Sequence, residues 1–303
     1  MGILEGVDDV YTLVADSGGT TTEWGLVEDP DHRLETVGLN PHHLRPQQIV
    51  SVLRSRVRPW LGDRTLKSVR FFGAGLGTSE LCTQMGHMLE KHLETRIDVN
   101  VASDLMGAAL ACLGTRPGLV GILGTGSVAL ASDGTSLVAR RGGHGYLLGD
   151  EGGAASLGRS LLRALLQGKL PQAVLRDYEA WSGMAADAWV THVYSCERAG
   201  SFLAAQARFL SRHLEVAGVR KLLLDDFDHF LREYLLPLCE VHPGPVVLMG
   251  GVARAHNGLL LEHCAQIKLE VEVLMEKPID RMLTGLSLSA GLGRSTRSNS
   301  SHP

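Results

Sequence analysis

A pattern that occurs twice constrains the fold of this chain more than any other feature: a strand-like run, a turn rich in Gly, Ser and Thr, and a second strand-like run. The first copy covers residues 10–27, with its turn at 16–22, and the second covers 119–131, with its turn at 124–127. Each copy predicts a β-hairpin, because apolar and β-branched runs around a glycine-containing turn are typical of paired strands. The second copy therefore begins a second cycle of the fold.

Strand and helix patterns alternate after the first hairpin, which points to an α/β domain. Apolar spacing predicts helices over 47–60, 81–93 and 105–113 and strands over 68–73 and 97–101. Beyond the second hairpin, it predicts helices over 154–167 and much of 171–240, a strand and turn over 245–253, and a closing helix over 279–292.

A break at residues 115–118 separates the two cycles. We therefore expect an N-terminal domain over 1–117 and a C-terminal domain over 118–278. The closing helix over 279–292 is expected to pack back on the first domain. The polar, Ser-rich tail over 294–303 is expected to be disordered.

Composition narrows the class of protein. The 303 residues are 44% hydrophobic, and the 29 Lys and Arg residues are outnumbered by 33 Asp and Glu residues. The basic residues are scattered, which argues against a nucleic-acid or anionic-membrane partner. Neither a signal peptide nor a membrane span is evident, and the five cysteines are widely spaced, so we expect a cytoplasmic protein with reduced thiols.

Two adjacent carboxylates, Asp150 and Glu151, stand inside a glycine-rich run over 142–153. Burying carboxylates beside bare backbone is costly unless a polar partner is present, and glycines allow main-chain N–H groups to approach a ligand closely. A bound small polyol would satisfy both conditions.

The two hairpin turns could together hold a triphosphate through backbone N–H groups and hydroxyls. With the residues at 16–22, 124–127 and 247–252, the chain resembles the actin, Hsp70 and sugar-kinase superfamily in its two phosphate motifs and its adenosine motif. The residues at 38–42 and 145–152 resemble the sugar-binding segments of its N-acetylglucosamine kinase branch, which is grouped with BadF/BadG-type ATPases. These five ordered motifs span residues 13–292.

The resemblance implies an α/β protein of two ribonuclease H-like (actin-like ATPase) domains with a central cleft. It also implies an ATP-dependent kinase that phosphorylates a hydroxyl, O6 by family analogy, of N-acetylglucosamine or a related amino sugar. By the same resemblance Asp104 is the general base, and Asp16 holds Mg²⁺ through water.

Further roles follow from the matched motifs. The residues implied to contact the nucleotide and its phosphates are Ser17, Gly18, Gly19, Thr20, Thr21, Gly124, Thr125, Gly126, Ser127, Gly250 and Gly251. Those implied to contact the sugar are Asn40, Gly145, Asp150 and Glu151.

Simpler interpretations stay open for these residues. Asp104 could be a helix N-cap, Asp16 a turn residue that ends a strand, and each Gly-rich turn a plain hairpin. The pair Asp150 and Glu151 could serve the N-terminus of the following helix through its dipole.

Three positions depart from the family pattern. His144 stands where many hexosamine kinases have Trp, Val128 where they have Asn, and Thr21 where Lys or Arg is common. Recognition of an acetyl group is thus less supported than phosphoryl transfer.

Other functions also remain open. They are an ATPase that activates a partner enzyme through an iron–sulfur cluster, a sugar or ATP sensor that has lost transfer, and a kinase for glucosamine or N-acetylmuramic acid. The apolar helical content of 154–240 could supply a homodimer surface.

Overall fold

The computed structural model describes residues 10–93 and 98–295 of the chain. The chain divides into two compact units, the first formed by residues 1–114 with 276–303 and the second by residues 115–275. Each unit contains one five-stranded sheet of mixed direction.

The sheet of the first unit has the order β3-β2-β1-β4-β5. Its strands are β1 (Val10–Ser17), β2 (Thr21–Leu26), β3 (Arg33–Val37), β4 (Thr65–Gly73) and β5 (Asp98–Ser103). The first three strands form an antiparallel meander, whereas β1, β4 and β5 run parallel. The predicted hairpin over 10–27 is therefore confirmed.

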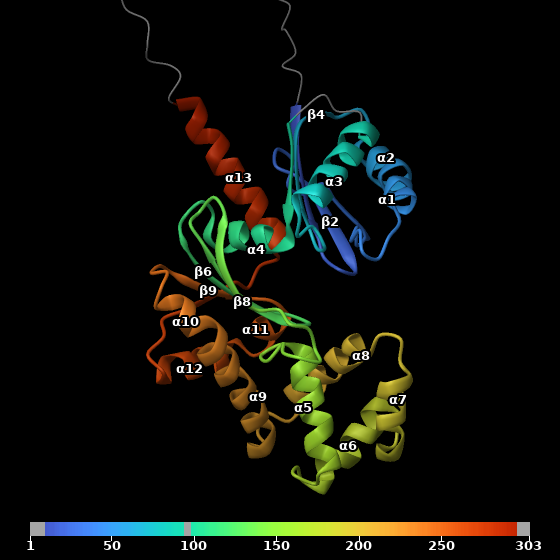
Figure 1. The fold of residues 1–303 in the computed structure, drawn as a ribbon, viewed down its shortest axis with the longest axis vertical. Coiled ribbons are helices and arrows are strands. Elements are labelled where there is room, and N and C mark those ends of the chain that lie inside the picture. The colour runs from blue at the N-terminus through green and yellow to red at the C-terminus, as the bar shows by residue number, and fades with distance from the viewer. Residues whose placement is uncertain (1–9, 94–97, 296–303) are drawn as a thin grey trace, which may run out of the picture. The chain divides into compact units, whose positions relative to one another are not determined.

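Helices cover both faces of this sheet (Figure 1). On one side lie α1 (Pro46–Val52), the π-helical turn η1 (Leu53–Val57), α2 (Arg58–Leu61) and α3 (Ser79–His92). Their apolar faces form a core with the strands, which includes Leu13, Trp24, Ile49, Leu53, Phe71, Met85 and Leu89. On the other side lie α4 (Asp104–Leu113) and α13 (Pro278–Ser295).

A close contact joins α4 to the sheet and to α13. A β-carbon at Gly107 would lie 2.7 Å from the Cβ of Phe72 and 3.0 Å from the Cε of Met282. Only glycine allows this approach without displacing its neighbours.

The second unit repeats the topology of the first. Its sheet has the order β10-β9-β6-β7-β8, and its strands are β6 (Gly118–Leu123), β7 (Ser127–Ser132), β8 (Leu137–Gly142), β9 (Val246–Met249) and β10 (Glu272–Val273). The strands β6, β7 and β8 are antiparallel, whereas β6, β9 and β10 are parallel. The second predicted hairpin is confirmed as well.

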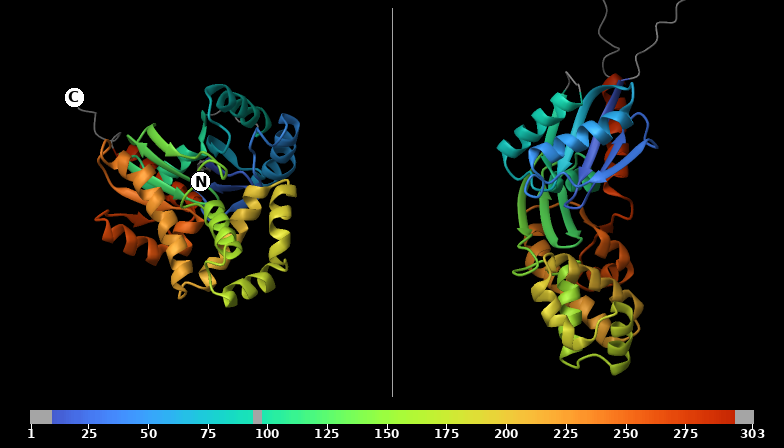
Figure 2. Two further views of the ribbon diagram at one scale, coloured as in Figure 1. Left: turned by 60° about the horizontal axis from the view of Figure 1, so that its bottom comes forward. Right: turned by 90° about the vertical axis from the view of Figure 1, so that its right-hand side faces the viewer.

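The helices between the third and fourth strands of this unit gather on one side of the sheet (Figure 2). They are α5 (Ala154–Leu166), α6 (Gln172–Ser182), η2 (Ala186–Ala188), α7 (Trp189–Ser195), α8 (Ala199–Gln206), η3 (Ala207–Arg212), α9 (Ala217–His229), η4 (Phe230–Leu235) and α10 (Leu236–Cys239). The remaining helices of the unit are α11 (Gly251–Ala255) and α12 (Asn257–Gln266).

Proline explains the two π-helical turns. Pro59 and Pro237 each follow a π-helical turn by two residues. Because proline has no N–H and its ring crowds the carbonyl four residues earlier, the preceding turn widens. The wider turn η4 carries Tyr234, which belongs to the candidate site below.

The predicted helices and strands occur with shifted ends. The closing helix over 279–292 is observed as α13, and the helix over 154–167 as α5. The edge strands β3, β8 and β10 were not predicted. Of the tail expected to be disordered, Arg294 and Ser295 end α13, and residues 296–303 lie outside the described part of the chain.

Candidate functional site

The predicted acidic residues of the first unit stand where its parallel strands end. Asp16 is the second-last residue of β1, and Asp104 directly follows β5, with β4 between these two strands. Ligands of open α/β sheets bind at the carboxyl ends of the strands, where loops and helix N-termini meet. The topology therefore brings both predicted carboxylates to the carboxyl ends of the parallel strands, where ligands of such sheets bind.

Asp16 is an unusual carboxyl group. Burial raises its pKa to about 6, and the negative charges of Glu23 and Asp104 add to this effect. Glu23 is its direct cross-strand partner on β2, so both side chains lie on the same face of the sheet. Excess negative charge in a partly buried position favours either a proton or a cation.

Asp104 is the first residue of α4, and it does not cap the helix. The N-cap is Ser103, whose hydroxyl accepts a hydrogen bond from the N–H of Met106 at 3.3 Å. The N-cap alternative for Asp104 is therefore wrong. Burial raises the pKa of Asp104, although the N–H of Leu105, at 2.9 Å from Oδ1, favours the charged form.

The first Gly-rich turn is held by its own backbone and by a neighbouring loop. The N–H of Gly18 donates to the carbonyl of Thr21, and the N–H of Gly38 donates to that of Thr20. A β-carbon at Gly38 would lie 2.5 Å from the carbonyl oxygen of Gly18, so the loop approaches the turn closely only because Gly38 lacks one. Gly19 and Thr20 stay exposed.

Ser17 differs from the rest of this turn because its side chain is fully buried. Its hydroxyl lies 2.8 Å from that of Thr22 and accepts a hydrogen bond from the N–H of Leu39 at 3.0 Å. The hydroxyl of Ser17 thus shapes the turn, and the exposed Gly19, Thr20 and Thr21 are left to meet a ligand.

Asn40 is buried in the loop that follows. Its Oδ1 accepts a hydrogen bond from the N–H of His42 at 2.9 Å, which fixes the orientation of the amide. A β-carbon at Gly75, in the loop after β4, would overlap this Oδ1. The Gly-rich loop at 73–77 thus packs directly against a predicted sugar-binding residue.

In the second unit, the second Gly-rich turn is bonded to the start of α5. The carbonyls of Gly124 and Thr125 accept hydrogen bonds from the N–H groups of Ala154 and Ala155, both at 2.9 Å. These N–H groups would otherwise lack a partner within the helix. The turn itself therefore caps α5.

Asp150 lies against the same turn and is almost completely buried. Its Oδ1 is 3.4 Å from the N–H of Ser127, and a β-carbon at Gly126 would lie 2.5 Å from its Oδ2. Asp150 has a φ of 66°, a left-handed conformation that glycine adopts freely and that aspartate and asparagine adopt only occasionally. A strained, buried carboxylate in such a place is typical of a binding site.

Glu151 has a different partner. Its carboxylate accepts a hydrogen bond from the hydroxyl of Tyr234 at 2.6 Å, and its own carbonyl accepts one from the hydroxyl of Ser127, also at 2.6 Å. Burial opposes ionisation of Glu151, but the bond from Tyr234, the backbone and the charges of His229 and Arg159 together hold its pKa below the ordinary value.

The helix-dipole alternative for this acidic pair is not supported. The helix α5 begins at Ala154, its N-cap is Gly153, and its first turn contains no acidic residue. Asp150 and Glu151 belong instead to the turn before the helix.

Gly145 and Gly250 both have backbone conformations that favour glycine. Gly145 is exposed, with a φ of 80°, and its carbonyl accepts the N–H of Gly149. Gly250 has a φ of 110°, and a β-carbon there would overlap the carbonyl oxygen of Leu123. The predicted adenosine motif at Gly250 and Gly251 thus lies beside the second Gly-rich turn, at the ends of the parallel strands β6 and β9.

Sequence reasoning missed three side chains of the second unit. Asp226 on α9, Tyr234 on η4 and Arg159 on α5 all bond to the first turn of α5 or to the glycine-rich run over 142–153, which we call the acidic glycine segment. Asp226 and Tyr234 follow Glu151 by more than 70 residues, so no local spacing connects them. A signal was available for Asp226, because it occupies an apolar position of an amphipathic helix.

The carboxylates around Asp16 match the needs of a hydrated Mg²⁺. Among residues 10–93 and 98–295, no three His, Cys, Asp or Glu side chains form a group that could hold a metal. A hydrated Mg²⁺ needs only one or two protein carboxylates, and Asp16, with two further negative charges beside it, fits this requirement.

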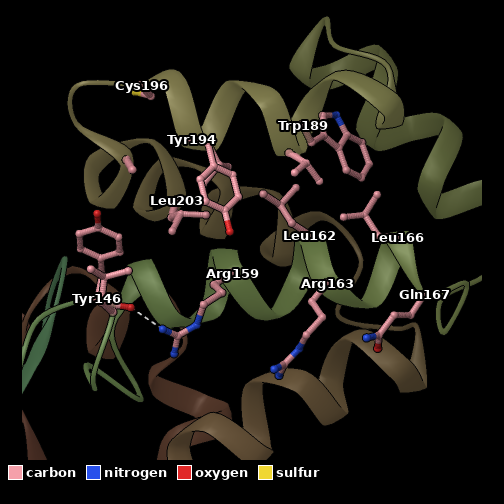
Figure 3. A pocket seen from close by; sticks show the side chains of 14 residues that line it. Tyr146, Arg159, Leu162, Arg163, Leu166, Gln167, Trp189, Tyr194, Cys196 and Leu203 are labelled. Atoms are coloured by element: carbon pink, nitrogen blue, oxygen red, sulfur yellow. Dashed lines mark hydrogen bonds between the residues drawn. The ribbon is translucent and has the colours of Figure 1, made fainter.

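A cavity of about 530 Å³ lies between α5, α7 and α8 (Figure 3). Its lining is mostly apolar and includes Leu162, Trp189 and Leu203. A polyol would find few hydrogen-bonding groups there, so this cavity does not fit the predicted substrate. Tyr146, from the acidic glycine segment, lines one end of it.

Comparison with known proteins adds to this geometry. A solved structure from Porphyromonas gingivalis, described as a "Putative N-acetylglucosamine Kinase", is 30% identical, with a TM-score of 0.85 over 92% of this chain and 99% of that chain. A second, from Chromobacterium violaceum and described in the same words, is 20% identical, with a TM-score of 0.68 over 91% and 99% of the two chains. No family model and no curated protein sequence matches the chain.

The fold is shared more widely. A ROK family glucokinase from Streptomyces griseus, solved with glucose and AMPPNP, is 17% identical, with a TM-score of 0.53 over 92% of this chain and 98% of that chain. At this identity the likeness shows the fold alone. The predicted actin-like ATPase fold is thus confirmed, and none of the described helices is long and apolar enough to cross a lipid bilayer.

Proposed function

Because the chain belongs to the N-acetylglucosamine kinase family of actin-like sugar kinases, we propose that it transfers the γ-phosphate of ATP to a hydroxyl of N-acetylglucosamine or a related amino sugar. The hydroxyl we propose is O6. The observation that carries the proposal is the structural match at 30% identity along 99% of a protein described as a kinase for this sugar.

Asp104 is the proposed general base. In the transfer, the sugar hydroxyl forms a bond to the γ-phosphorus, the bond from that phosphorus to ADP breaks, and the hydroxyl proton passes to the carboxylate. Two features of Asp104 support this role. Ser103 already caps the helix, so the carboxylate is not needed there, and burial raises its pKa and hence its basicity.

Asp16 is the proposed ligand, through water, of Mg²⁺. When bound, the cation would neutralise charge on the phosphate oxygens. Burial, followed by the negative charges of Glu23 and Asp104, raises the pKa of Asp16, and a cation beside it would offset these charges. The exposed Gly19, Thr20 and Thr21 of the first turn are proposed to meet the terminal phosphates, with Gly124, Thr125 and Gly126 of the second turn.

Asp150 and Glu151 are proposed to hold the sugar, with Asn40 and the backbone at Gly145. The carboxylate of Asp150 is buried, and the hydrogen bond that it accepts from the N–H of Ser127 is long at 3.4 Å. A carboxylate can accept several hydrogen bonds, so sugar hydroxyls would complete its partners.

The test is release of ADP by the purified protein with Mg²⁺ and ATP, against N-acetylglucosamine, glucosamine, N-acetylmannosamine, N-acetylmuramic acid and glucose. We expect strong stimulation by N-acetylglucosamine or one related amino sugar. Phosphorus NMR of the product then identifies the phosphorylated hydroxyl. ATP binding with no stimulation by any of these sugars would overturn the proposal.

A further inference from the structure

Asp226 is a buried carboxylate that accepts hydrogen bonds from the acidic glycine segment and from α5. It lies on α9, is about nine-tenths buried, and uses both carboxylate oxygens. Oδ2 accepts the N–H of Gly152 at 2.9 Å, and Oδ1 accepts the hydroxyl of Ser156 at 3.0 Å. One side chain thus bonds to the end of the segment and to the first turn of α5.

The network continues to the other end of the segment. The guanidinium of Arg159, one turn further along α5, lies 3.3 Å from the hydroxyl of Ser156 and also donates to the carbonyl of Tyr146. Figure 3 shows the guanidinium of Arg159 directed at this carbonyl. The segment over 146–152 is therefore held at both ends by side chains that belong to one network.

Burial makes the charged form of Asp226 costly. Burial raises its pKa to about 6, although the hydrogen bonds from Gly152 and Ser156 favour the charged form. Glu151 adds repulsion and Arg159 adds attraction. An apolar side chain at position 226 would avoid this cost. It would suit the location, because the neighbouring α9 residues Leu223 and Phe227 pack in the core.

We propose that Asp226 is a positioning residue, which holds Gly152 and Ser156 so that Asp150 and Glu151 are presented to the sugar in one geometry. The inference deepens the proposed function and rests on it, because the acidic pair is a sugar site only if the protein is a sugar kinase. Asp226 acts through backbone and hydroxyl groups and does not contact the substrate.

Kinetics of three variants test this role. Asp226→Ala is expected to raise the KM for the sugar about tenfold, because the sugar would lose about one hydrogen bond to the displaced carboxylates of Asp150 and Glu151. The KM for ATP should stay within about twofold of the wild-type value. Asp226→Asn is expected to recover part of the loss, because its amide can accept from Gly152 and donate to Ser156. Asp225→Ala is the matched control, since Asp225 is its exposed neighbour on α9 and pairs with Lys221 at 2.7 Å.

Equal KM values for the sugar in wild type and Asp226→Ala would overturn the proposal. So would an equal rise in the KM for ATP, because a general loss of structure affects both substrates. If Asp226→Ala does not fold, Ser156→Ala removes the hydroxyl donor to Asp226 and keeps the hydrogen bond from the N–H of Gly152. Ser156→Ala should then raise the sugar KM in the same direction, and an unchanged KM would count against the proposal.

Hydrogen exchange separates this proposal from the proposed function. In Asp226→Ala the amides of residues 145–153 should exchange faster, whereas those in the core of α9 should exchange as in wild type. If wild type shows no sugar-dependent turnover, the proposed function fails, and faster exchange would still show that Asp226 orders the segment. Unchanged exchange over 145–153 would overturn the positioning role by itself.

Discussion

The two Gly-rich hairpin turns have similar compositions and equivalent places in their sheets, yet they are built into the protein differently. The turn after β1 bonds to itself and to the loop at Gly38, and its tip is exposed. The turn after β6 caps α5 and packs on the buried Asp150. The first turn is thus an open loop, whereas the second turn packs against the acidic glycine segment.

The difference shows why turns at equivalent places of two similar sheets can have different functions. An exposed turn can close on phosphate oxygens with its own N–H groups and hydroxyls. The second turn is bonded to Asp150, to Glu151 and to the start of α5. A ligand bound at this turn is therefore coupled to the position of the acidic glycine segment. We therefore expect changes at Asp104 in the first unit to affect transfer, and changes at Asp150, which packs on the second turn, to affect the sugar.

The largest effect is expected in the first unit, from Asp104→Asn. Loss of a general base lowers kcat about 10²- to 10⁴-fold, and the KM values for ATP and sugar should change little. Steady-state ADP release measures this effect. Asp98→Asn is the control, since Asp98 lies on β5 and pairs with Arg70 at the surface. Wild-type kcat in Asp104→Asn would show that another group takes the proton.

In the second unit, Asp150→Asn is expected to raise the Kd for the sugar about 10- to 100-fold, because hydrogen bonds to a charged group are lost. Asparagine tolerates the left-handed backbone at this position, so the fold should be kept. Isothermal titration with the sugar provides the measurement. Equal affinity in both proteins would place the sugar elsewhere.

A pair of glycine variants compares the turns directly. Gly126→Ala would press a methyl group on Asp150 and should lower the free energy of unfolding by about 1–3 kcal/mol. Gly19→Ala has open space around it and should fold as wild type does. Thermal unfolding of both variants measures the difference. Equal melting temperatures would mean that the second turn is as free as the first.

The smallest expected effect is on the pH dependence of stability, through Asp226 in the second unit. Its pKa in the folded state is raised to about 6, so between the unfolded value near 4 and about 6 the folded protein binds the extra proton. The contribution of Asp226 to stability should therefore fall as pH rises through this window, with a slope of at most about 1.4 kcal/mol per pH unit, and Asp16, whose pKa is also raised to about 6, adds a slope of the same sign. Asp226→Asn should flatten the curve in chelator-treated buffer, whereas an unchanged curve would assign the slope to other groups.

Central strands were predicted more completely than edge strands, of which β5 was predicted and β3, β8 and β10 were missed. Central strands such as β1 and β6 were predicted because their residues are apolar and end at glycine-rich turns. The missed strands β3, β8 and β10 lie at sheet edges and carry charged residues, such as Arg33 and Glu35 on β3, because edges meet water. Their pairing depends on a neighbouring strand that local sequence does not reveal.

The candidate site shows the same limit. Asp16, Asp104 and Asp150 could be proposed from ordered motifs, because each stands next to a recognisable strand or turn. The bond from Ser103 that frees Asp104 from capping, and the buried hydroxyl of Ser17, could not be predicted, since serine next to a strand or helix end suits either role. Only the surroundings of each hydroxyl decide which one applies.

The sequence by itself determined the two α/β cycles, the hairpin turns and the family, because these depend on local periodicity and on motifs in a fixed order. The tertiary structure alone decided which groups share one environment. It placed Tyr234 against Glu151 and Asp226 against Gly152, which lie 83 and 74 positions apart in the chain. The physical reason is that a buried carboxylate needs donors from wherever the chain packs, and packing joins residues that no sequence period relates.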